Sequence, residues 1–112
     1  MTQAIATHIT AAPRFIPVIG DAMEPALPNG SYAAVVPLDA YHGEGIYAVT
    51  LLEGAVEFLR VQANMRGGFV ASRDNGRTGP ETLTASQFGA MVLGKVAAQC
   101  LMMDRGLLPG MA

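Results

Sequence analysis

Short apolar runs alternate along the chain with clusters of Gly, Pro, Asn and Asp, a pattern that predicts strands separated by turns. No long segment has the 3.6-residue period of an amphipathic helix. We therefore expect a mainly β domain, compact and twisted, with only short helical turns. The expected strands are Phe15–Ile19, Tyr32–Val36, Ile46–Leu52, Ala55–Gln62, Phe69–Ser72 and Met91–Gln99, and one helical turn is expected at Thr84–Phe88.

Three local features refine this prediction. Pro17 has no amide donor, which favours an edge strand at Phe15–Ile19. The run Ile46–Leu52 is nearly all apolar, as in strands buried on both faces, and the Glu53-Gly54 turn signal joins it to Ala55–Gln62 in a hairpin. A further turn, Asp74-Asn75-Gly76, opens a loop that runs to Pro80.

The length of 112 residues and the absence of repeats predict one domain. Residues 1–12 are rich in Ala and Thr and weakly patterned, so we expect a flexible segment there and a domain over residues 13–112. The start lacks the basic and apolar regions of a signal peptide, and no run approaches the roughly 18 apolar residues of a membrane helix. We expect no membrane contact and a cytoplasmic location, with which the single cysteine, Cys100, agrees.

Composition narrows the possible partners. Only 14% of residues are charged, 51% are hydrophobic and the formal net charge is −2. The few arginines are scattered, whereas phosphate binding needs clustered basic side chains. We therefore expect no direct contact with DNA. So little charge also predicts exposed apolar surface or a partner that covers it.

The stretch VIGDAMEPALPNG, Val18–Gly30, predicts a sharp turn with Ala22 at its apex. Its order of residues, with the Pro-Asn-Gly turn before an apolar strand, resembles the C-terminal domain of LexA-like repressors. That family of self-cleaving Ser-Lys peptidases includes lambda-type phage repressors and UmuD-type mutagenesis proteins, and is related in fold to bacterial signal peptidases. The resemblance spans residues 14–98 and continues through the hairpin 45–62, Ser72–Asn75 and Leu93–Val96.

The resemblance implies an active site that has lost its chemistry. In the family the turn carries a nucleophilic serine, where this chain has Ala22, and the second hairpin strand carries a lysine base, where it has Glu57. Arg60 lies three residues further on, which places it on the opposite face of a regular strand, and a guanidinium stays protonated. The only lysine, Lys95, falls in the last strand. The scissile Ala-Gly or Cys-Gly dipeptide of the family is also absent.

We therefore expect no catalytic residue, and neither a cofactor nor a metal. Because both the serine and the lysine are missing, natural loss is favoured over a serine replaced by engineering, which stays an alternative. Asp21 and Glu24 are interpreted as backbone caps or solvent-facing groups rather than paired carboxylates. His42 has no second histidine at ligand spacing, since His8 lies in the flexible start, and is interpreted as a loop residue.

Two further features have ordinary structural explanations. Cys100 is expected to be a small buried hydrophobe, because no motif flanks it. Gly67-Gly68 is expected to form a turn rather than a phosphate cradle, because no helix start with a lysine follows. The segment after the last strand has two interpretations: it folds over the core, or it lines an interface. Its large apolar residues are Leu101, Met102, Met103, Leu107, Leu108 and Met111.

The function that the resemblance implies is self-association, as the dimerisation or oligomerisation domain of a phage-type or prophage-type transcriptional repressor. DNA would be reached only through a separate DNA-binding domain, encoded before residue 1 or on another polypeptide. Linking two such domains raises avidity by about 10²–10⁴. The alternative is a stand-alone UmuD-like or anti-repressor-like subunit that binds another protein.

Overall fold

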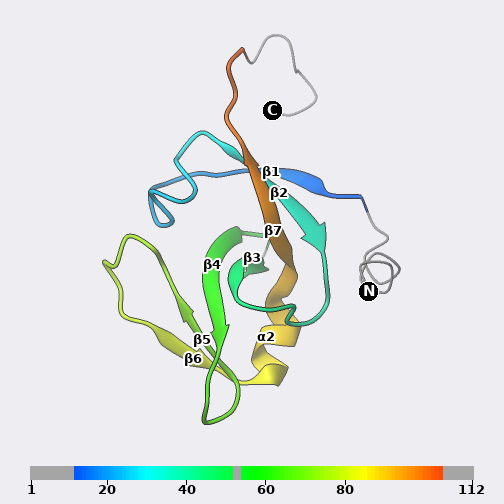
Figure 1. The fold of residues 1–112 in the computed structure, drawn as a ribbon, viewed down its shortest axis with the longest axis vertical. Coiled ribbons are helices and arrows are strands. Elements are labelled where there is room, and N and C mark those ends of the chain that lie inside the picture. The colour runs from blue at the N-terminus through cyan, green and yellow to red at the C-terminus, as the bar shows by residue number, and fades with distance from the viewer. Residues whose placement is uncertain (1–11, 52–53, 105–112) are drawn as a thin grey trace.

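Seven antiparallel strands form one sheet in the order β1-β2-β7-β3-β4-β5-β6 (Figure 1). The computed structural model describes residues 12–51 and 54–104. The strands are β1 (Arg14–Pro17), β2 (Tyr32–Pro37), β3 (Gly45–Thr50), β4 (Val56–Ala63), β5 (Phe69–Ser72), β6 (Glu81–Leu83) and β7 (Val92–Cys100), and the helix is α2 (Ala85–Met91). The mainly β class is confirmed. The expected flexible segment lies almost wholly outside the described residues.

The strand predictions agree closely with the structure. β1 is an edge strand, as Pro17 indicated. β3 and β4 pair from Gly45↔Val61 to Thr50↔Val56, which confirms the hairpin. The prediction missed β6, which follows directly after the expected loop to Pro80; it is three residues long and pairs with β5 at Phe69↔Leu83.

The helix is longer than the expected single turn. Thr84 caps it by accepting a hydrogen bond of 3.0 Å from the Gln87 backbone N–H, and the Gln87 side chain accepts one of 2.9 Å from the Thr84 N–H. This reciprocal pair is a capping box. Phe88, 1% exposed, packs into the core and holds the helix onto the sheet.

The sheet is buried on both faces at its centre. Ala48 of β3 packs into one hydrophobic cluster, while its neighbours Tyr47 and Val49 pack into the other, so the expected two-sided burial of this strand is confirmed. The turn-side cluster comprises Val18, Met23, Leu27, Ala33, Val35, Ala48 and Phe58. The helix-side cluster comprises Tyr47, Val49, Leu59, Val61, Ala71 and Phe88.

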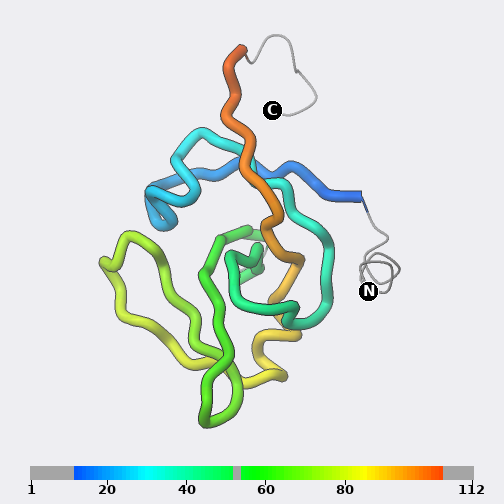
Figure 2. Tube along the Cα trace, in the orientation of Figure 1, coloured from blue at the N-terminus to red at the C-terminus, as the bar shows by residue number. Residues whose placement is uncertain are grey.

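Two connections approach each other on one side of the molecule. The loop between β1 and β2 and the loop between β5 and β6 lie side by side (Figure 2), and the Asn75 backbone N–H donates a hydrogen bond of 3.0 Å to the Ala22 carbonyl oxygen. The expected turn at 74–76 is confirmed, because the Gly76 N–H donates to the Arg73 carbonyl at 3.1 Å.

Candidate functional site

The turn around Ala22 is an excursion from the β1–β2 ladder. The Val18 N–H donates to the Ser31 carbonyl at 2.8 Å and the Gly30 N–H donates to the Val18 carbonyl at 2.9 Å, so the antiparallel pairing extends one step beyond β1. The chain then leaves the ladder at Gly20, whose φ of +91° suits glycine. The Gly20 N–H donates to Asn29 Oδ1 at 2.8 Å and closes the excursion.

Burial and capping hold the turn in place. Met23 and Leu27 insert into the turn-side cluster, and the Leu27 N–H donates to the Met23 carbonyl at 2.8 Å. Glu24 Oε2 accepts a hydrogen bond of 3.2 Å from the Asn29 N–H, so Glu24 caps the backbone as expected. Ala22, fixed by these contacts, offers only a methyl group.

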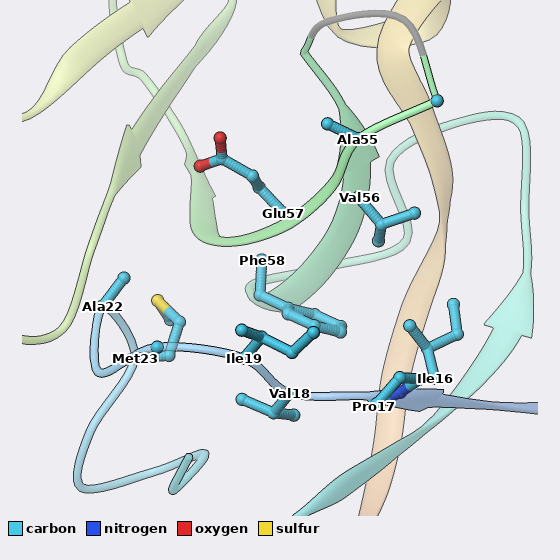
Figure 3. A pocket seen from close by; sticks show the side chains of 12 residues that line it. Ile16, Pro17, Val18, Ile19, Ala22, Met23, Ala55, Val56, Glu57 and Phe58 are labelled. Atoms are coloured by element: carbon cyan, nitrogen blue, oxygen red, sulfur yellow. The ribbon is translucent and has the colours of Figure 1, made fainter. Parts of the chain in front are cut away.

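The structure brings Ala22 and Glu57 to one groove of about 620 Å³ (Figure 3). One wall comes from β1 and the turn after it, and the other from the start of β4. Figure 3 shows Ala22 and Glu57 on these two walls. The lining residues are Ile16, Pro17, Val18, Ile19, Gly20, Ala22, Met23, Gly54, Ala55, Val56, Glu57 and Phe58. The groove is therefore mainly apolar.

Glu57 forms an ion pair with an arginine. Arg73 Nη2 lies 2.9 Å from Glu57 Oε1, and Arg73 Nη1 lies 4.0 Å from Glu81 Oε1. A carboxylate held by a guanidinium accepts hydrogen bonds and carries negative charge, but it supplies no amine. The two positions that the resemblance singles out thus hold a methyl group and an ion-paired carboxylate.

A second arginine fixes the loop that carries Arg73. Arg60 Nε and Nη2 each lie 2.8 Å from a different carboxylate oxygen of Asp74, a two-point geometry that is stronger than a single contact. The hydrogen bond from Arg60 lowers the pKa of the Asp74 carboxyl, and the same bond raises the pKa of Arg60. Arg60 itself lies outside the groove.

The loop is also tied to the turn by charge. Arg77 Nη2 lies 3.0 Å from Asp21 Oδ2, with both side chains well exposed. Sequence reasoning did not identify this set of pairs, Arg60–Asp74, Arg73–Glu57 and Arg77–Asp21. A local pattern does not reveal them, because each pair joins segments that only the fold brings together. The signal in the sequence was the pair of adjacent, oppositely charged residues Arg73 and Asp74.

The remaining candidates have structural explanations. His42 donates its backbone N–H to the Tyr47 hydroxyl at 2.6 Å, and the described residues contain no group of three or more metal-ligating side chains. The Gly67 N–H donates to the Asn64 carbonyl at 2.9 Å, which confirms the expected turn. His8 lies outside the described residues.

The expectation for Cys100 was wrong in one respect. Its thiol is free, but the residue is only half-buried. The reason is the position at the end of β7, where Ala97, Ala98 and Gln99 are exposed. β7 pairs with β3 only from Val92 to Lys95, so the end of the strand has less cover than its start.

The apolar tail, as far as it is described, is exposed at two of its three apolar residues, and Met102 is half-buried. Leu101 and Met103 are 61% and 94% exposed, so neither packs over the core. Leu107, Leu108 and Met111 lie outside the described residues.

No helix in the described part of the chain has the length and apolar character needed to cross a membrane.

Comparisons with known proteins give no assignment. No protein-family model matches the chain, and no curated protein matches it.

Proposed function

We propose that this chain is a non-catalytic self-association domain of a phage-type or prophage-type transcriptional repressor, with DNA contacted by a separate domain or polypeptide. Self-association is the part of the proposal that rests on this chain's own surface. The repressor context rests on the resemblance of residues 14–98 to the LexA-like family.

The open end of β7 carries the proposal. Within the described residues, β7 is paired on both sides at Gly94 and Lys95, but from Val96 to Cys100 it is paired with β2 alone. A strand with one free edge is a template for a further strand. The small exposed side chains Ala97 and Ala98 leave that edge accessible, and the exposed Leu101 and Met103 follow it directly.

A second copy is the occupant that this surface fits best. The same strand end from two copies can pair antiparallel about a twofold axis, which makes a self-complementary interface. Such pairing satisfies the free backbone groups of both strands. It also buries Leu101 and Met103, whose exposure is otherwise unfavourable at about 25 cal/mol per Å².

The groove supports the non-catalytic part of the proposal. A Ser-Lys peptidase needs a hydroxyl nucleophile and a neutral amine as its base. At the corresponding positions this groove has the Ala22 methyl group and the Glu57 carboxylate, which is paired with Arg73.

One observation favours a second candidate, a protein-interaction subunit of the UmuD-like or anti-repressor-like kind. Ile19 is 88% exposed at the groove that Val56, 39% exposed, also lines. An apolar groove with an exposed apolar edge suits a segment of another protein.

Sedimentation velocity over a concentration series separates the two candidates. Self-association predicts a reversible rise of the sedimentation coefficient with concentration. A single monomeric species at every concentration would contradict self-association and would leave the hetero-partner as the better proposal.

A further inference from the structure

Lys95, the only lysine of the chain, lies in the middle of the sheet. On β7 it is opposite Val36 of β2 and Tyr47 of β3, and the residue is half-buried. The hydrogen bond of its ammonium group is exposed, so the group is open to a ligand from solvent.

The loop before β3 is built around this lysine and its neighbour Tyr47. The Tyr47 hydroxyl accepts from the His42 N–H at 2.6 Å and donates to the Gly43 carbonyl at 2.6 Å. Lys95 Nζ donates to the His42 carbonyl at 2.7 Å and lies 5.8 Å from the centroid of the Tyr47 ring. These contacts fix the ammonium against the loop.

Gly45 leaves room for the lysine side chain. A Cβ atom at position 45 would lie 2.6 Å from Lys95 Cε, which is closer than real Cβ contacts. Gly45 has no positive φ, so its backbone conformation does not require glycine. A side chain at position 45 would therefore require the end of the Lys95 side chain to move.

The charge of Lys95 has no acidic partner in the described part of the chain, where all four ion pairs involve arginines. An ammonium has three N–H donors, and the His42 carbonyl takes one of them. Donors remain for an anion, and a hydrogen bond between an ammonium and a carboxylate is stronger than a neutral one.

A small depression of about 240 Å³ lies beside Lys95. It is lined by Val36, Leu38, His42, Lys95, Val96 and Ala97. Apart from the histidine and the lysine, these side chains are aliphatic. The volume is below the range of about 300–1,000 Å³ that is common for drug-sized ligands, so the ligand that fits is small.

We propose that this depression binds a small aliphatic monocarboxylate, with the carboxylate on Lys95 Nζ and the hydrocarbon chain against Val36 and Leu38. A single ammonium matches a single negative charge, whereas a phosphate ester needs several basic or backbone donors. The site is separate from the groove, but it shares Val96 and Ala97 with the strand end proposed for self-association.

The test is a titration of the whole chain with sodium butyrate, followed by amide chemical shifts in NMR. It is run at a protein concentration where sedimentation shows one species, because Val96 and Ala97 belong to the strand end proposed as the interface. Butyramide, acetate and inorganic phosphate are the comparison compounds. An acetylated Leu-Leu dipeptide with a free carboxylate separates a small acid from a peptide terminus.

Three variants accompany the titration. Lys95→Gln removes the charge. Ala97→Glu places a carboxylate at the depression, where it competes for Lys95, and Ala97→Gln is its matched neutral control. Ala97 is exposed, so both substitutions at this position leave the core intact and keep the test valid if Lys95→Gln disturbs the loop.

The proposal predicts saturable shifts around His42, Lys95 and Val96 with butyrate, with a Kd on the order of 1 mM. Butyramide and phosphate leave these shifts unchanged and acetate binds more weakly. Lys95→Gln and Ala97→Glu weaken butyrate binding by about tenfold or more, and Ala97→Gln does so far less. No saturable response to butyrate, or an equal response to butyramide, acetate or phosphate, would overturn the proposal. Tighter binding of the dipeptide would overturn the assignment to a small acid.

Discussion

The backbone N–H of Asn75 donates a hydrogen bond of 3.0 Å to the carbonyl oxygen of Ala22. This bond joins the loop after β5 to the apex of the turn after β1, and three arginine–carboxylate pairs join the same loop to β4 and to the turn. The wall of the groove is thus held by charged contacts from a loop that is distant in sequence. The stability of the protein should therefore respond to pH, to salt and to reversal of these charges.

The Asp74–Arg60 pair makes stability depend on acid pH. The pKa of Asp74 is lower in the folded protein than in the unfolded chain, where an aspartate titrates near 3.9. The unfolded state therefore binds a proton first as pH falls, and stability decreases below about pH 4. Asp74→Asn should lower the free energy of unfolding at neutral pH by about 1 kcal/mol. It should also make the free energy of unfolding depend less on pH below about pH 4.

Urea midpoints measured from neutral pH to pH 3 check this prediction, with Asp39→Asn as a control at an exposed carboxylate. A wild-type and an Asp74→Asn protein with the same acid dependence would contradict it.

Reversing the charge of Glu57 should destabilise the loop contact. Glu57→Gln removes the attraction to Arg73, and Glu57→Lys adds repulsion between two cations. Both side chains are partly exposed, so we expect a loss of a few tenths of a kcal/mol for glutamine and about 1 kcal/mol for lysine. Thermal melts at low and high salt measure it, since salt should narrow the gap between the two variants. A gap insensitive to salt would argue against this contact.

Introducing a serine at position 22 should not confer self-cleavage. Ala22→Ser supplies a hydroxyl, but Glu57 remains a carboxylate bound to Arg73, and no amine stands ready as a base. Intact mass after prolonged incubation at alkaline pH should be unchanged for the wild-type chain and for Ala22→Ser. A specific cleavage product from either chain would refute the non-catalytic interpretation.

Gly94 of β7 is required by close packing. A Cβ atom there would run into the Val36 carbonyl oxygen and lie 2.8 Å from Val35 Cγ1. Gly94→Ala should destabilise the protein by about 1–3 kcal/mol, as overpacking does. Gly89→Ala in α2 is the matched control, because it meets no atom within 4 Å and should stabilise the helix by up to about 1 kcal/mol. Denaturant unfolding of both variants measures the change in the free energy of unfolding. Equal changes for Gly94→Ala and Gly89→Ala would show that the close packing at Gly94 is unimportant.

Local patterns predicted most of the sheet. The apolar run of β3 and the turn signal after it indicated a buried hairpin, and Pro17 indicated an edge. β6 escaped prediction because Glu81–Leu83 is short and mostly exposed, so its strand form depends on pairing with β5 rather than on its own composition. The capping box of Thr84 and Gln87 was not predicted, and the helix extends beyond the expected turn to Met91.

The candidate site was likewise predictable only in part. The resemblance alone predicted that Ala22 and Glu57 belong to one site, and the structure places both at one groove. The partner of Glu57 was not predictable, because Arg73 reaches it only after β4 and β5 have paired. The exposed end of β7 likewise depends on how far β3 extends beside it.

The most direct test of the central claim compares two fully exposed methionines. Met103 follows the open end of β7, whereas Met65 lies in the turn after β4, and the two are 94% and 103% exposed. Sedimentation velocity of Met103→Asp and Met65→Asp is measured beside the wild-type chain. The account predicts that the wild-type chain and Met65→Asp associate alike and that Met103→Asp shifts toward monomer by about tenfold or more in Kd. Equal association of all three chains, or none in any of them, would contradict self-association through this end of β7.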